Sequence, residues 1–424
     1  MLYRLKHLDR SINVAIVGIG AMGKGLVYQC HITPGIKCVA VADINVDKAV
    51  QSIALIGQNY RVVRNLEEMN DTIRKGAVAI CENGDLLAQC EMVHVFIESS
   101  NSIGPAARFA ITALKHRKHL ILMNSEIDLI FGPYLLESAR NNGVIYTSCD
   151  GDQHGVIKRM MNEIKLWGFD IVMAGNIKGF LDRYSNPTKI IPEADKRNLG
   201  YKMATSYTDG TKLNIEMALV ANSEGFSANI PGMLGPRANH VSEVFQLFDF
   251  ENIRERKLPV VDYILGAEPG GGVFVIGYCD EKYQRGMLNY YKMGSGPFYL
   301  FYRPYHLCHI EAMACIAEAV LDGRSLLQPA FGFFTNVFSY AKQDLKKGGR
   351  LDGIGGYACY GLIENVLHGD SSTGLPICLA EDVTLKRDIA RDERILMSDV
   401  HFNPDSFEHD LYCKALEISR KWRK

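Results

Sequence analysis

The sequence feature that most constrains the fold is a glycine motif near the N-terminus, Gly18-x-Gly20-x-x-Gly23. An apolar run over residues 12–17, predicted as a strand, comes directly before it, and a helix-like stretch follows it. A second apolar run ends at Asp43, which lies 20 residues after Gly23. This context is typical of the first β-α-β unit of a Rossmann-type dinucleotide-binding domain.

Each part of the motif has a physical role in binding a dinucleotide. Gly18 allows the tight turn, Gly20 lets the backbone approach the pyrophosphate, and Gly23 lets helix and strand pack closely. Ala21 and Met22 open the predicted helix, whose first N–H groups have no partner within the helix and attract phosphate. The alternative is an ordinary glycine-rich turn in a doubly wound protein.

Polar residues at the ends of the predicted strands are candidates for binding the rest of the cofactor. Asp43 is expected to bind the ribose hydroxyls and to repel a 2′-phosphate, which favours NAD over NADP. Glu98, Ser99 and Ser100 end the next apolar strand, and Asn124 follows the strand after that, where the nicotinamide half would lie. The alternative for these loop residues is capping of the strand ends.

The order of elements predicts an α/β fold with three parts. Residues 1–155 alternate apolar strands with helical runs and predict a Rossmann domain with a parallel sheet. Residues 156–370 are expected to form an α+β catalytic domain, with helices that return to the Rossmann domain. Residues 371–424 contain short strands between charged turns and predict a small β module.

The densest polar segment, residues 182–212, is the first candidate for substrate chemistry. Asp209 and Lys212 are three residues apart at the start of a predicted helix, which places carboxylate and ammonium on one face. A lysine held there can donate a proton to a carbonyl oxygen as hydride arrives. Lys202 lies in the same segment and is a further candidate. The alternative is a surface ion pair in which Asp209 caps the helix.

A second candidate is the run Arg303-Pro-Tyr305-His306, just before a predicted helix that begins at His309. Arginine ahead of a helix N-terminus suits a substrate phosphate or carboxylate, with Tyr305 or His306 donating to substrate oxygens. The alternative is an aromatic corner of the core with a satisfied histidine. The turn over residues 150–155 is a third candidate, either a hinge or a plain turn.

The spacing of the acidic residues does not settle whether a metal binds. Four carboxylates are candidates: Asp152, Glu193, Asp209 and Glu216.

Composition excludes several classes of protein. The formal charge is −1 with no dense basic block, which argues against a nucleic-acid partner. No apolar run approaches the roughly 18 residues that span a bilayer, and the first residues do not resemble a signal peptide. The 11 cysteines include no C-x-x-C pair, which favours free thiols in a reducing cytoplasm.

These residues resemble a known family. The glycine motif, the strand edge at Glu98 and the helix beginning Thr211-Lys212-Leu213 are similar to those of homoserine dehydrogenases. Residues 151–153, 208–214 and 303–306 resemble a branch of that family typified by 1-deoxy-D-xylulose 5-phosphate reductoisomerase-like enzymes. Residues 380–389 look like a SAF-type β-clip module.

The resemblance implies an NAD(P)H-dependent oxidoreductase that rearranges and reduces a phosphorylated keto-sugar, a step of isoprenoid biosynthesis. A divalent metal would organise the substrate oxygens, and Lys212 matches the proton-transfer lysine of homoserine dehydrogenases. That family places an aspartate four residues before the lysine, where this chain has Thr208. This departure disfavours homoserine as substrate, and Asp43 disfavours strict use of NADPH.

Three hypotheses therefore stay open at the level of sequence. The first is a reductoisomerase or reductase of a phosphorylated keto-sugar. The second is a metal-independent dehydrogenase of another small alcohol or semialdehyde. The third is a regulator that binds NAD without turnover. The expected partners are a small-molecule substrate and further copies of the chain in a homo-oligomer, with no nucleic acid and no membrane.

Overall fold

The computed structural model describes residues 1–197, 199–366, 374–403 and 405–422. The chain divides into two compact units, and each draws on separate stretches of sequence. Unit 1 comprises Met1–Gly155 and Leu307–Gln328, and unit 2 comprises Val156–His306 and Pro329–Lys424. The boundary drawn from sequence between residues 370 and 371 lies outside the described residues.

Unit 1 is built on a seven-stranded sheet in the order β3-β4-β2-β1-β5-β6-β7, and all its strand pairs are parallel. Its strands are β1 (Ile12–Val17), β2 (Ile36–Ala42), β3 (Tyr60–Val62), β4 (Val78–Cys81), β5 (Val95–Glu98), β6 (His119–Leu122) and β7 (Tyr146–Ser148). Its helices are α1 (Leu2–Lys6), α2 (Ala21–Ile32), α3 (Val46–Leu55), α4 (Leu66–Arg74), α5 (Gly84–Gln89), α6 (Gly104–Lys115), α7 (Ser125–Asn142) and α15 (Cys308–Leu321).

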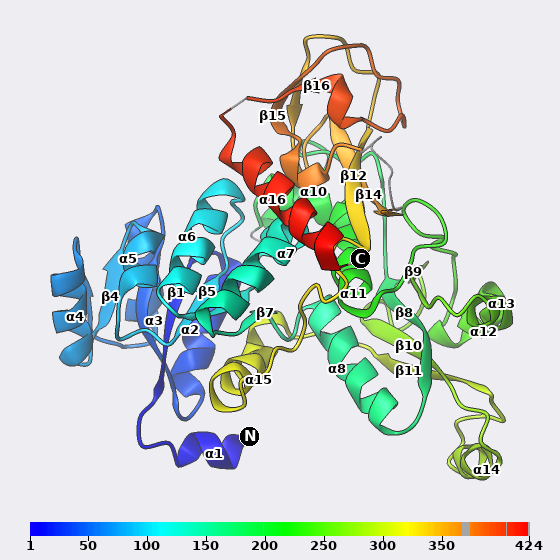
Figure 1. The fold of residues 1–424 in the computed structure, drawn as a ribbon, viewed down its shortest axis with the longest axis horizontal. Coiled ribbons are helices and arrows are strands. Elements are labelled where there is room, and N and C mark those ends of the chain that lie inside the picture. The colour runs from blue at the N-terminus through cyan, green and yellow to red at the C-terminus, as the bar shows by residue number, and fades with distance from the viewer. Residues whose placement is uncertain (198, 367–373, 404, 423–424) are drawn as a thin grey trace. The chain divides into compact units, whose positions relative to one another are not determined.

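The parallel sheet confirms the predicted α/β class. Strands β4 and β5 are buried at every position, because helices cover the sheet on both faces. The helix α15, drawn in yellow, returns to this unit and lies beside the blue α2 (Figure 1). A Cβ added at Gly25 of α2 would lie 2.4 Å from the His309 ring, so the glycine permits this close approach.

Unit 2 contains a mixed four-stranded sheet in the order β11-β10-β8-β9, in which β8 and β9 are parallel and the other pairs antiparallel. Two smaller antiparallel sheets, β12-β14 and β13-β15-β16, complete it. Its strands are β8 (Asp170–Lys178), β9 (Val260–Leu265), β10 (Val273–Tyr278), β11 (Phe298–Arg303), β12 (Thr335–Ala341), β13 (Arg350–Asp352), β14 (Cys359–Asn365), β15 (Glu381–Leu385) and β16 (Val400–His401).

The helices of unit 2 are more varied in length than those of unit 1. They are α9 (Ile191–Arg197), α10 (Tyr201–Thr208), α11 (Thr211–Glu224), α12 (Val244–Leu247), α13 (Phe250–Glu255), α14 (Lys282–Tyr290) and α16 (Phe407–Trp422), with α8 (Gln153–Leu166) crossing from unit 1. Among the residues that the structure describes, no helix has the length and apolarity needed to cross a membrane.

The core of unit 2 explains why α11 has no exposed polar face. This helix packs against β8 and β9 of the large sheet and also against β12 and β14. All its residues are buried except Lys212 and Glu224. A helix enclosed in this way shows no amphipathic stripe, because each of its faces contacts protein.

The polar segment 182–212 contains the helices α9 and α10. Two expectations about the β module need correction. The small antiparallel sheets begin at Thr335, well before the position expected for the β module. They belong to unit 2, because β14 and β12 pack on α11.

Candidate active site

The glycine loop of unit 1 has the geometry that its sequence predicts. Gly18 has a φ of +86°, and its N–H donates to the Ala42 carbonyl at 2.9 Å. A Cβ at Gly18 would lie 2.6 Å from the Ser100 nitrogen, and one at Gly23 would lie 1.9 Å from the Gly18 oxygen. At Gly20, in contrast, nothing lies within 4 Å of an added Cβ. Packing therefore requires the first and third glycines, while the second keeps a space open.

The N-terminus of α2 faces that loop with its amides available. Gly20 is the N-cap and offers no side chain, and Ala21 and Met22 form the first turn, which holds no acidic residue. The first amides of a helix have no acceptor within it, and they carry the positive end of its dipole. This arrangement suits a phosphate group.

Asp43 ties the loop to the end of β2. Its Oδ2 accepts from the Ile19 N–H at 2.6 Å, and its Oδ1 accepts from the Asn45 N–H at 2.8 Å. The carboxylate is half-buried and has lone pairs left for ribose hydroxyls.

Glu98 ends β5 as a buried carboxyl group. Burial raises its pKa to about 8, although hydrogen bonds from Ser100 and Asn124 act in the opposite direction. Its Oε1 accepts from the Ser100 N–H at 3.1 Å, whereas Oε2 has no aligned hydrogen-bond partner within the described ranges. Glu98 is therefore largely protonated at neutral pH and able to donate a hydrogen bond.

The other predicted cofactor residues shape the neighbouring loops. The Ser99 hydroxyl lies 2.8 Å from the Val17 carbonyl oxygen and 2.9 Å from that of Gly18, and the Ser100 hydroxyl bonds to that of Ser102 at 2.9 Å. Asn124 caps α7 through its Oδ1, which accepts from the Ile127 N–H at 3.2 Å. Its side-chain amide donates to the Ser102 carbonyl at 2.7 Å. Capping, the alternative considered above, thus describes Asn124.

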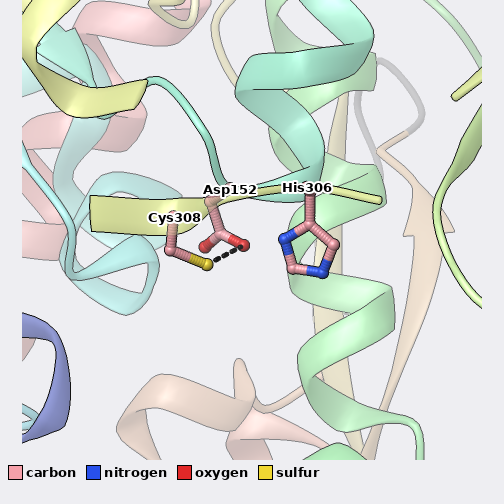
Figure 2. A group of neighbouring side chains, drawn as sticks. All are labelled: Asp152, His306 and Cys308. Atoms are coloured by element: carbon pink, nitrogen blue, oxygen red, sulfur yellow. Dashed lines mark hydrogen bonds between the residues drawn. The ribbon is translucent and has the colours of Figure 1, made fainter. Parts of the chain in front are cut away.

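The turn after β7 places an acid beside a thiol in unit 1. Asp152 is nearly buried, and its Oδ1 lies 3.9 Å from the Cys308 Sγ, as Figure 2 shows. The His154 Nδ1 lies 4.0 Å from the other carboxylate oxygen. His306, also drawn in Figure 2, precedes Cys308 by two positions and is the last residue of that stretch of unit 2. An oxygen and a sulfur ligand of this kind suit a borderline metal such as Zn²⁺.

In unit 2, Asp209 pairs with a lysine that the sequence analysis did not single out. Its Oδ2 lies 2.8 Å from the Lys342 Nζ, and both side chains are almost fully buried. Its Oδ1 accepts from the Thr211 N–H at 2.8 Å. The expectation that Asp209 starts the same helix as Lys212 is wrong. Asp209 is the C-cap of α10, and Gly210, with a φ of +87°, separates the two helices.

A partly buried lysine, Lys178, forms a group of four charges with Asp209, Lys342 and Glu216. Its Nζ donates to the Tyr207 carbonyl at 2.8 Å. Burial lowers the pKa of Lys178, while Glu216 and Asp209 favour its charged form. Lys178 is the last residue of β8, and Lys342 directly follows β12. A charged residue at the end of an apolar strand is the sequence signal that could have identified these two lysines as site residues.

The remaining predicted catalytic residues lie in different surroundings. Lys212 is partly exposed in the first turn of the otherwise enclosed α11. Lys202 is exposed, and its Nζ donates to the Glu381 carboxylate at 2.8 Å and the Asp352 carbonyl at 2.7 Å. It therefore fastens α10 to the small sheets. Arg303 ends β11 with its guanidinium 4.4 Å from the centre of the exposed Tyr305 ring.

A polar hollow of about 330 Å³ in unit 2 lies beside the Asp209–Lys342 pair. Lys342 lies at its wall, and Lys189 and Arg391 add two further cations. The Arg391 guanidinium lies 3.8 Å from the centre of the Tyr184 ring, which fixes its position. The other lining residues are Asp182, Tyr184, Asn186, Gln343 and Tyr357. Because Asp209 balances the charge of Lys342, two further cations and one carboxylate remain, and the hollow suits a small polar anion.

Residues 151–312 match the family model "Oxidoreductase DRL, catalytic domain". This segment, which contains Lys178, Asp209, Lys212 and Arg303, is similar to the catalytic domain of that oxidoreductase family.

The chain is also similar, more distantly, to a curated protein. A homoserine dehydrogenase of Bacillus subtilis (strain 168) is 24% identical over 235 residues, which are 52% of this chain and 50% of that protein. The chain thus spans about half the length of this curated relative.

Two solved structures share parts of the fold. One is titled "probable dehydrogenase from Thermotoga maritima" (TM-score 0.39, 12% identity, 74% of this chain and 90% of that one). The other is DOX-P reductoisomerase in complex with magnesium (TM-score 0.34, 13% identity, 49% and 56%). Scores at this level carry no argument about substrate.

Proposed function

We propose that the chain is an NAD(P)H-dependent oxidoreductase that delivers hydride to the carbonyl of a small phosphorylated keto-sugar, like the 1-deoxy-D-xylulose 5-phosphate reductoisomerases. The observation that carries this is the glycine loop, open at Gly20 and anchored by Asp43, in a chain with a segment similar to the DRL catalytic domain. The nicotinamide half is assigned to the loop after Glu98, where a protonated carboxyl can donate to it.

Unit 2 supplies the groups proposed for the substrate. Lys212 gives the proton to the carbonyl oxygen as hydride arrives, since it is the polar residue of α11's first turn that is not buried. The cations Lys189 and Arg391 are proposed to hold the substrate phosphate in the polar hollow. Arg303, Tyr305 and His306 are proposed as further substrate contacts.

A divalent metal fits one of the candidate carboxylates better than the others. Lysines neutralise Asp209 and Glu216, and Glu193 lies 3.5 Å from Arg197 on the surface. Asp152 is therefore the proposed ligand. The metal would supply Lewis acidity at the substrate oxygens.

The second candidate function is a metal-independent dehydrogenase of another alcohol or semialdehyde, favoured by the match to a homoserine dehydrogenase. The third is an NAD-binding regulator without turnover. Burying Asp209, Lys342 and Glu216 beside the partly buried Lys178 is costly for a protein that only binds a nucleotide, and this observation favours an enzyme.

The deciding experiment follows oxidation of NADH and NADPH with 1-deoxy-D-xylulose 5-phosphate, with and without Mg²⁺, Mn²⁺ or Zn²⁺. Metal-dependent turnover supports the reductoisomerase, and metal-independent turnover of a semialdehyde supports the dehydrogenase. Lys212→Met is expected to abolish turnover and to leave nucleotide binding intact, with Lys202→Met as the matched control. Nucleotide binding without turnover of any carbonyl substrate supports the regulator.

Cofactor choice has its own test at Asp43. NADH should bind more tightly than NADPH, because the carboxylate repels the 2′-phosphate. Asp43→Asn keeps an acceptor for the Ile19 N–H and should narrow that preference by about tenfold, the effect of ~1.4 kcal/mol. An unchanged preference would remove Asp43 from cofactor selection.

The remaining proposals concern assembly and cellular place. We propose a cytoplasmic homo-oligomer acting in isoprenoid biosynthesis, with the small sheets of unit 2 serving as a SAF-type module. All 11 cysteines are free thiols in the structure, which supports a reducing compartment. Light scattering of the purified chain would test the oligomeric state.

A further inference from the structure

Besides the polar hollow of unit 2, the structure has a hollow of about 500 Å³ in unit 1, at the edge of the sheet opposite the glycine loop. Its walls come from the residues just before β1, β5 and β6 and from the end of α15. These are the amino ends of parallel strands, whereas the glycine loop and Glu98 lie at the carboxyl ends. Strands of four to six residues place the two edges roughly 13–20 Å apart.

Three cations line this hollow and none of them is paired. They are Arg10, Arg117 and Lys118. Within the described ranges, none forms an ion pair or a hydrogen bond through its side chain. Lys118 is only 5% exposed as a residue, and burial lowers its pKa, while Cys90 and Glu91 favour its charged form. Its ammonium has no hydrogen-bond acceptor among the described residues, and an anion bound in the hollow would supply one.

Two histidines of the hollow are held as hydrogen-bond donors. The His94 Nδ1 accepts from the Asn13 N–H at 3.0 Å, and the His119 Nδ1 accepts from the Ile145 N–H at 3.1 Å. A ring nitrogen that accepts from a backbone amide carries no proton, so the proton of the neutral ring is on Nε2. Burial also lowers the pKa of both histidines, which keeps the rings neutral.

The charges and the apolar walls of the hollow indicate which class of ligand it can bind. Glu91 is the one carboxylate among the lining residues, against the three unpaired cations. The side chains of Val93, Val320 and Leu321 add an apolar wall. A ligand with one anionic group and a short apolar body would meet both surfaces.

We propose that this hollow binds a small organic anion, a carboxylate or phosphate on a short apolar body, at a site separate from the dinucleotide site. Lys118 lies at the centre of the anion's contacts, with His94 and His119 donating through Nε2. The proposal does not depend on the proposed reaction, because the hollow lies wholly within unit 1 and away from the glycine loop.

The test is calorimetric titration of the full chain with phenyl phosphate and with phenylacetate, in saturating NADH to fill the dinucleotide site. We expect saturable binding of at least one probe. Lys118→Met should weaken it by about tenfold or more, since a hydrogen bond to a charged group contributes ~1.5–3 kcal/mol. Lys115→Met is the matched control, because Lys115 is exposed at the end of α6 and does not line the hollow.

Two further variants keep the test decisive. Arg391→Gln alters the polar hollow of unit 2 and should leave probe affinity within about twofold. Arg10→Gln replaces Lys118→Met if the latter fails to fold, and it should weaken binding in the same direction. Absence of saturable binding, or binding lost with Arg391→Gln and kept with Lys118→Met, would overturn the proposal.

Discussion

Among the single residues of unit 1, Glu98 combines deep burial with a position at the end of a central strand. Its carboxyl group has a pKa of about 8 in the folded chain, against an ordinary value near 4.5, because burial disfavours the charged form. The folded state therefore holds a proton that the unfolded chain releases at lower pH. Stability must fall as pH rises from about 4.5 to about 8, and then level off.

Glu98→Gln should remove this pH dependence, because glutamine has the shape of the protonated acid. Wild-type unit 1 should lose ~1 kcal/mol of unfolding free energy per pH unit between pH 6 and 8, and the variant should lose much less. Thermal melts across this range provide the measurement. Asp128→Asn is the control, since burial raises the pKa of Asp128 only to about 6, so its effect is complete below that range. Parallel wild-type and Glu98→Gln curves would show that Glu98 is ionised when folded.

At the scale of elements, the glycines of the loop between β1 and α2 have two different roles, one in packing and one in nucleotide binding. A Cβ at Gly23 would collide with the Gly18 oxygen, whereas a Cβ at Gly20 would enter open space. Gly23→Ala should destabilise unit 1 by ~2–4 kcal/mol through displaced backbone. Gly20→Ala should keep the melting temperature and weaken nucleotide binding about tenfold or more. Equal effects of the two substitutions on stability would contradict this division.

The link between α10 and β12 depends on the buried pair of Asp209 and Lys342. Lys342→Met leaves Asp209 buried without its cation and also leaves the Ser185 and Gly356 carbonyls unpaired. We expect a loss of ~3–5 kcal/mol in denaturant unfolding. Adding Asp209→Asn to that variant should restore part of the lost unfolding free energy, because the double variant no longer buries an uncompensated carboxylate.

A nearby surface pair provides the control for this prediction. The exposed Lys346 lies 2.9 Å from Asp388, and Lys346→Met should leave the unfolding midpoint nearly unchanged. Equal losses of unfolding free energy for Lys342→Met and Lys346→Met would mean that the buried pair contributes no more to stability than the exposed pair.

The same elements show what sequence can predict. The strand predicted over residues 12–17 has the bounds of β1, because buried strands are short apolar runs with local signals. The pairing of Asp209 with Lys342 joins residues far apart in the chain, and no local pattern carries that information. The capping role of Asn124 and the tether formed by Lys202 likewise depend on partners that only the fold brings near.

At the scale of the whole chain, the two units exchange segments, since the chain crosses between them after Gly155, His306 and Gln328. The predicted domains follow sequence order, with helices of residues 156–370 expected to return to the Rossmann domain. The helix α15 belongs to unit 1 in this way, and residues from Pro329 onward rejoin unit 2. Helical periodicity is visible in the sequence of α15, but tertiary packing decides at which residues the chain leaves and rejoins each unit.

This division predicts how the cofactor stabilises the chain. The dinucleotide is proposed to bind unit 1, so NADH at about 100 times its Kd should stabilise that unit by ~2.7 kcal/mol. Hydrogen exchange should slow in β1, β2 and β5, whose amides lie around the glycine loop, and change least in β8 and α11 of unit 2. Gly20→Ala should roughly halve the stabilisation at the same NADH concentration, because a tenfold weaker Kd leaves ~1.4 kcal/mol. Slowing of equal size throughout both units would mean that nucleotide binding is coupled to the stability of the whole chain, and the proposed assignment to unit 1 alone would then be wrong.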